Sequence, residues 1–228
     1  MALFGNLKFN NMVEINPYIA TVSFESAIAD YTGAPYVVAL DSATSGIFLS
    51  LLYEGVNGKE ISIPSRTYMS VPCSIIQAGA KVKFTPVDAV PLKGAYQLIG
   101  SKTWDSALRF TADMYIPDTF MCCSFTGSTK ILKLSKGGCI LTDNKDAYEW
   151  FKLMRFSGRE ECNYHNQKSF GMIGWNFYMI PEIATRGLTL FGQFYNLDGS
   201  KKHVPDAENF YPDLSLHSIY TDDNSTNS

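Results

Sequence analysis

The loop after residues 120–125 carries the lysines best suited to covalent chemistry. An apolar, strand-like run leads there into Thr126-Gly127-Ser128-Thr129-Lys130, and Lys133 and Lys136 follow. A lysine that is partly removed from water has a lowered pKa, and its neutral amine can form an imine with a carbonyl group. A loop lysine is usually a solvated charge, so composition does not choose among the three.

Polar groups also follow three other predicted strands, at the ends where open α/β sheets build binding sites. Residues 41–46 (DSATSG) enter a helix whose free N–H groups could hold a phosphate, although Ser42 is also an ordinary helix N-cap. Asp105 could keep a pyridine nitrogen protonated, and Tyr68 could lie on an aromatic ring. A capping aspartate and a core tyrosine are the structural alternatives, so none of these segments decides the function alone.

The elements that must position these groups alternate along the chain. Short β-rich runs and helical patterns follow one another, which predicts a layered α/β domain with a mostly parallel sheet. We expect strands at residues 36–40, 61–64, 82–84, 103–105, 120–125 and 139–142. We expect helices at about residues 24–31, 47–52, 71–78, 148–154 and 181–195.

Composition excludes several classes of function. The 228 residues carry a net charge of -3 without a dense basic run, so we expect no nucleic-acid partner. The N-terminus lacks an apolar signal region and no stretch is long enough to span a membrane, so we expect a soluble protein without a signal peptide. Five cysteines without a CxxC pair indicate free thiols in the cytoplasm, and three scattered histidines do not suggest a metal site.

In chain order, these segments resemble the DegT/StrS family of sugar aminotransferases, which belong to the aspartate aminotransferase superfamily (fold type I). The resemblance covers about residues 20–195. It rests on residues 24–25, 36–39, 42–45, 64–68, 77–80, 86–88, 105–107, 124–125, 154–158, 174–179 and 182–183, and on Lys130 standing seven residues before Gly137-Gly138. That spacing selects Lys130 among the three lysines.

The family implies a fold and an activity for this chain. Residues 1–195 would form the three-layer α/β/α large domain that binds pyridoxal 5'-phosphate. Residues 196–228 would be a C-terminal extension with a disordered end, and the family's small C-terminal domain would be absent. The implied reaction moves an amino group from glutamate to a keto sugar that is linked to a nucleotide.

The family also implies roles for single residues. Lys130 would form the Schiff base with the cofactor, Asp105 would pair with the pyridinium nitrogen, and Tyr68 would stack on the ring. The remaining cofactor contacts would come from Ser42, Ala43, Thr44, Ser45 and Ser124, and from Asn176 of a partner subunit. A site shared in this way implies a homodimer.

Departures from the family pattern keep an alternative open. Leu108 stands where the family usually has Gln or His, which would bond the ring hydroxyl of the cofactor. Together with the missing small domain, this leaves a cofactor-binding homologue without turnover, or with a regulatory role, as the alternative. An unrelated nucleotide-binding protein is the third reading, but residues 127–130 (GSTK) lack the GxxxxGK[ST] pattern of a phosphate loop.

Overall fold

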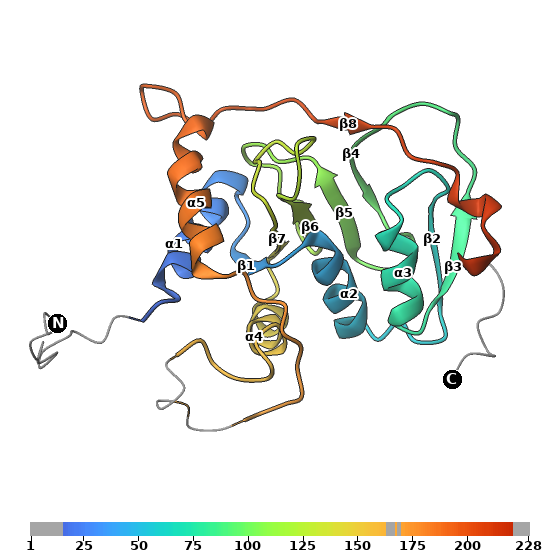
Figure 1. Ribbon diagram of the computed structural model, residues 1–228, viewed down its shortest axis with the longest axis horizontal. Coiled ribbons are helices and arrows are strands. Elements are labelled where there is room, and N and C mark those ends of the chain that lie inside the picture. The colour runs from blue at the N-terminus through green and yellow to red at the C-terminus, as the bar shows by residue number, and fades with distance from the viewer. Residues whose placement is uncertain (1–15, 163–166, 168–169, 221–228) are drawn as a thin grey trace, which may run out of the picture.

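A mixed β-sheet forms the centre of the protein. The computed structural model describes residues 16–162, 167 and 170–220. Six strands lie in the order β1-β7-β6-β5-β4-β8, and a separate pair joins β2 to β3 (Figure 1). The strands are β1 (Tyr36–Leu40), β2 (Glu60–Pro64), β3 (Lys81–Thr85), β4 (Leu92–Gln97), β5 (Thr103–Leu108), β6 (Phe120–Ser124), β7 (Gly138–Thr142) and β8 (Glu208–Asn209).

Helices cover both faces of the large sheet, which confirms the predicted three-layer α/β arrangement. Successive residues of a strand point to opposite faces, so Val37 and Val38 enter different hydrophobic clusters. The face of Val37 packs against α1 (Ile19–Thr32) and α5 (Pro181–Phe191). The face of Val38 packs against α2 (Ala43–Tyr53), α3 (Ser70–Gln77) and α4 (Lys145–Met154). Among the described residues, no helix is long and apolar enough to cross a membrane.

The prediction of a mostly parallel sheet is wrong, because most neighbouring strands of the six-stranded sheet pair antiparallel. In the large sheet only β5 and β6 pair in parallel, and the other neighbours are antiparallel. The reason is connection length: β4 and β5 are joined by residues 98–102 alone, which is enough for a hairpin but too short for a parallel crossover. β7 similarly runs against both β1 and β6.

Three strands nevertheless run in one direction. Because β7 is antiparallel to both β1 and β6, and β5 is parallel to β6, the carboxyl ends of β1, β5 and β6 lie at one edge of the sheet. The residues that follow these strands, Asp41 and Ser42 after β1 and Phe125 after β6, therefore meet there. This edge positions the candidate site.

A buried ionic network joins α1 to α4 below this edge. The Arg155 guanidinium is fully buried, and its Nη atoms lie 2.5 Å from carboxylate oxygens of Glu25 and Glu161. Glu25 also accepts a hydrogen bond from the backbone N–H of Ala39, on β1. The network therefore fixes α1 and α4 against the strand that leads to residue 41.

The chain after α5 crosses the carboxyl-end edge of the sheet before it forms β8 (Figure 1). The sequence analysis did not predict β4 or β8. β4 contains Lys93 and Gly94 and lacks an alternating pattern of apolar and polar residues, and β8 has only two residues. The division at residue 195 stays a prediction. The predicted disordered end, residues 221–228, lies outside the described residues.

Candidate functional site

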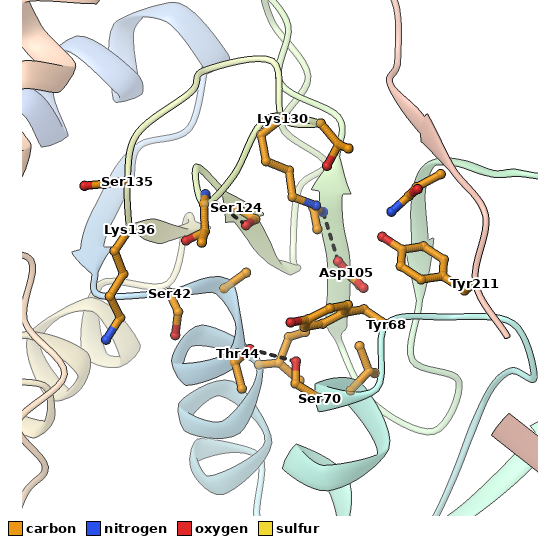
Figure 2. A pocket seen from close by; sticks show the side chains of 17 residues that line it. Ser42, Thr44, Tyr68, Ser70, Asp105, Ser124, Lys130, Ser135, Lys136 and Tyr211 are labelled. Carbon is orange, nitrogen blue, oxygen red and sulfur yellow. Dashed lines mark hydrogen bonds between the residues drawn. The ribbon is translucent and has the colours of Figure 1, made fainter. Parts of the chain in front are cut away.

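A cavity of about 410 Å³ lies at the carboxyl ends of β1, β5 and β6 (Figure 2). The N-terminus of α2, the start of α3, the loop of residues 126–136 and the segment around residue 210 complete its wall. Of the nine residues expected to contact a cofactor, seven line this cavity: Ser42, Ala43, Thr44, Tyr68, Asp105, Ser124 and Lys130. Ser45 and Asn176 do not line it. The cavity was therefore predictable in position, although its far wall was not.

The N-terminus of α2 offers backbone N–H groups to the cavity. Ser42 is the extended N-cap, and its hydroxyl accepts a hydrogen bond from the Ser45 N–H at 3.2 Å. Ser45 itself is buried and donates to the Asp41 carboxylate at 2.6 Å, so its side chain does not line the cavity. Thr44 does line it and hydrogen bonds the Ser70 hydroxyl at 2.7 Å. This end of the cavity suits an anion.

The turn into α2 can form only because a glycine stands beside it. Gly138 begins β7, and a Cβ atom at this position would lie 2.4 Å from the backbone nitrogen of Ala43. The neighbouring Gly137 has φ 145° and forms a bridge with Ser42. The Gly137-Gly138 pair thus serves close backbone approach rather than contact with a ligand.

Asp105 and Lys130 face the same cavity from β5 and from the loop after β6 (Figure 2). Asp105 is 5% exposed, and its carboxylate accepts hydrogen bonds from the Ala107 N–H at 2.9 Å and the Tyr96 hydroxyl at 3.1 Å. Burial raises the pKa of Asp105 and lowers the pKa of Lys130, although each charge favours the other. Both shifts favour the neutral forms, so burial outweighs their attraction.

The surroundings of the three lysines distinguish Lys130 from the others. Lys133 is exposed and outside the cavity lining. Lys136 lines the cavity, but its ammonium group pairs with Asp41 at 2.9 Å, and its side chain is 63% exposed. Burial lowers the pKa of Lys130, as imine formation requires. The loop of residues 126–136 leads into β7 and not into a helix, which removes the resemblance to a nucleotide phosphate loop.

Asn176 lies apart from this cavity. It lines a second cavity of about 370 Å³ together with Asp41, Lys136 and Tyr178. Lys136 is common to both cavities, so its ion pair with Asp41 lies between them. One chain therefore does not bring Asn176 to Lys130.

Seven polar residues of the cavity wall were not among the predicted cofactor contacts: Ser70, Thr126, Thr129, Ser135, Lys136, Asn209 and Tyr211. Ser70 could have been found, because it follows Tyr68 at the start of a predicted helix. Asn209 and Tyr211 lie far from the other motifs along the chain, in a segment without a periodic pattern. Only the path of the folded chain brings them to the site.

Comparison with known proteins finds a partial family match. The model of the DegT/DnrJ/EryC1/StrS aminotransferase family matches residues 10–99, which include the α2 turn and Tyr68. Over these residues the chain is similar to that family. A UDP-4-amino-4-deoxy-L-arabinose--oxoglutarate aminotransferase of Shewanella sediminis is 41% identical over 70 residues, which are 30% of this chain and 18% of the relative.

Several solved structures have the same fold as this chain. The 3-amino-5-hydroxybenzoic acid synthase superposes with a TM-score of 0.61 at 19% identity, covering 77% of this chain and 56% of that one. A DegT DnrJ EryC1 StrS aminotransferase from Brucella abortus superposes with a TM-score of 0.61 at 17% identity, covering 76% of this chain and 59% of that one. The sugar aminotransferase CalS13 from Micromonospora echinospora superposes with a TM-score of 0.58 at 17% identity, covering 77% of this chain and 61% of that one. The chain thus spans less than two thirds of each of these relatives.

Proposed function

We propose that this chain binds pyridoxal 5'-phosphate in the 410 Å³ cavity through Lys130 and transfers an amino group from glutamate to a keto sugar that is linked to a nucleotide. The observation that carries the proposal is the arrangement of Lys130 and the buried Asp105 in one cavity, with the N-terminus of α2 at its other end. The match of residues 10–99 to the aminotransferase family supports the reaction class, and the name of the Shewanella relative supports the oxoglutarate–glutamate couple and the nucleotide-linked sugar.

The residues of the cavity fit the chemistry of this cofactor. Its phosphate would be held by the N–H groups and hydroxyls at Ser42, Ala43 and Thr44, with Ser124 beside them. Ser45, which we expected among these contacts, would act through Asp41 and Ser42 instead. Tyr68 is half exposed on the cavity wall and would cover one face of the ring.

The chain's own groups would divide the chemistry among them. Pyridoxal 5'-phosphate supplies an aldehyde that joins amines and a ring that accepts electron density. Burial favours the neutral amine of Lys130, whose Nζ would join the aldehyde and, once released, would carry a proton between donor carbon and cofactor carbon. Asp105, when ionised, holds a proton at the ring nitrogen. Burial of Asp105 keeps water away from this pair and strengthens it.

A titration with pyridoxal 5'-phosphate tests cofactor binding. We expect visible absorption of the bound cofactor and, after borohydride reduction, a permanent mass increase on the peptide that contains Lys130. Lys130→Ala should lose both signals, whereas Lys133→Ala, a matched change at an exposed lysine of the same loop, should keep them. Absence of both signals in the unaltered protein would exclude the proposal.

A single-turnover experiment separates the enzyme from the non-catalytic alternative. Loaded protein mixed with L-glutamate should release one 2-oxoglutarate per bound cofactor, with matching loss of the visible band. A stable band without 2-oxoglutarate would identify a cofactor-binding homologue without turnover. The five free cysteines are compatible with action in a reducing compartment such as the cytoplasm.

We further propose that the chain acts as a homodimer in which Asn176 of each subunit reaches the phosphate of the other. The placement of Asn176 supports this, because Asn176 lines the second cavity and not the cavity that contains Lys130 of its own chain. Mixing inactive Lys130→Ala with Asn176→Ala chains should restore about a quarter of the normal activity, since half of the dimers would then contain one intact site. A mixture no more active than its components would refute the shared site.

A further inference from the structure

The segment of residues 204–214, here called the strap, forms the wall of the cavity beyond Asp105. It is held at the backbone of β4 and β5: Ala207 donates its N–H to the Leu108 carbonyl at 2.8 Å, and Gly94 donates to the Ala207 carbonyl at 3.2 Å. In an extended segment alternate side chains share a face. Asn209 and Tyr211 accordingly line the cavity, whereas Phe210 is exposed.

Side chains fix the strap on both sides of this contact. The Arg109 guanidinium donates two hydrogen bonds to the Asp206 carboxylate, at 2.9 and 2.7 Å. Beyond the cavity, Leu214 is buried and donates its N–H to the Ser65 carbonyl at 2.8 Å. Arg66 donates to the Tyr211 carbonyl at 3.3 Å. The strap is thus positioned by two independent anchors with the cavity between them.

The strap passes Leu108, where the sequence lacks the polar residue that the family resemblance leads one to expect. Leu108 is 2% exposed, lies outside the cavity lining and offers only an apolar side chain. Its backbone carbonyl is the group that binds Ala207 of the strap. The polar side chains that the wall beyond Asp105 does offer are Asn209 and Tyr211. The Tyr211 hydroxyl points into the cavity, toward the space between Asp105 and Lys130 (Figure 2).

Tyr211 is suited to donate a hydrogen bond. Burial raises the pKa of its hydroxyl, an effect that a hydrogen bond with Asn209 partly offsets, while the charge of Asp105 adds to it. The hydroxyl therefore keeps its proton at neutral pH. Its ring centroid lies 6.2 Å from that of Tyr68, so the two tyrosines form adjoining parts of the wall.

We propose that Tyr211, oriented by Asn209, donates a hydrogen bond to the ring hydroxyl oxygen of pyridoxal 5'-phosphate and takes the place of the polar side chain that Leu108 cannot provide. This inference rests on the proposed function. On the cofactor ring, the carbon that bears the hydroxyl group is next to the carbon that bears the aldehyde, on the side that leads to the ring nitrogen. Lys130 would join the aldehyde and Asp105 would pair with the ring nitrogen, and the Tyr211 hydroxyl points toward the space between these two residues.

The test is a pH titration of the visible absorption of the cofactor-loaded protein, with Tyr211→Phe compared with Tyr220→Phe. Tyr220 is a matched control, because it belongs to the same C-terminal stretch but packs against Phe84, outside the cavity lining. A donor to the ring oxygen stabilises the more negative form of the bound cofactor. Loss of such a charge-assisted bond should raise the spectral midpoint by roughly 1–2 pH units.

Affinity gives a second readout that needs no turnover. Tyr211→Phe should bind pyridoxal 5'-phosphate roughly 10-fold more weakly, while Tyr220→Phe should bind it like the unaltered protein. Equal spectral midpoints in the two variants, with the cofactor bound to both, would overturn the role of Tyr211 and leave the proposed function intact. If the unaltered protein does not bind the cofactor at all, both proposals are wrong.

Discussion

Replacing Asp105 with Asn should make the cofactor-free protein more stable while it removes the activity. The buried carboxylate accepts hydrogen bonds from the Ala107 N–H and the Tyr96 hydroxyl. An Asn side chain can keep the first with its carbonyl oxygen. Its amide can donate to Tyr96, whose hydroxyl lies 2.6 Å from Thr67 and can donate there instead. The substitution therefore leaves no polar group without a partner.

The sign of the stability effect follows from the raised pKa of Asp105, which burial causes. An acid with a higher pKa in the folded than in the unfolded chain binds a proton on folding between the two pKa values. The free energy of unfolding then falls as the pH rises through that window. At pH values above this window, the ionised carboxylate lowers the free energy of unfolding by about 1.4 kcal/mol for each pH unit by which its pKa is raised. An Asn side chain does not ionise, so the Asp105→Asn protein does not lose this free energy.

The functional cost is larger than the gain in stability. Asp105 would be the charge partner of the cofactor's ring nitrogen, and loss of one partner of a buried ion pair costs about 3–5 kcal/mol. In the rate of amino transfer this corresponds to a loss of roughly 10²- to 10⁴-fold. Asp105 would therefore be a residue kept for chemistry at the expense of stability.

Urea unfolding of the cofactor-free protein at several pH values measures the stability effect. Asp105→Asn should raise the free energy of unfolding at neutral pH and flatten its decrease with pH. Asp206→Asn is the control of opposite sign, because its hydrogen bonds with Arg109 lower the pKa of Asp206. That stability is present above the unfolded pKa and is lost as the pH falls through the folded one. A less stable Asp105→Asn protein at neutral pH would refute the reasoning.

Two further predictions concern the scaffold. Arg155→Met should lower the free energy of unfolding by about 3–5 kcal/mol, because it removes the fully buried one of the two cations, Arg155 and Lys152, that pair with Glu25 and Glu161. Lys145→Met, which breaks an exposed pair, should change it by less than about 0.5 kcal/mol. Chemical denaturation measures both. Gly138→Ala should cost about 1–3 kcal/mol and weaken cofactor binding, because its Cβ meets the α2 turn. Gly171→Ala, which meets open space, should do neither; equal effects would contradict the close-approach argument.

The class of fold and most of the residues that line the candidate cavity could be predicted from the amino-acid sequence. The helices and strands around the α2 turn, Asp105 and Lys130 arise from patterns within a few residues, so they could be predicted. The spacing between Lys130 and Gly137-Gly138 selected the lysine, and burial of Lys130 supports that choice. Ser45 shows the limit of such reasoning, because its hydroxyl turned to Asp41 rather than to the cavity.

Only the tertiary structure decided how distant segments meet. Strand direction depends on which elements become neighbours, and β7 and β4 entered between strands that run the other way. The strap is held by backbone hydrogen bonds and by two ion pairs with distant parts of the chain, Arg109–Asp206 and Arg66–Asp213. Backbone bonds of this kind leave no signature in residue types, so Tyr211 became part of the site only once the chain had folded.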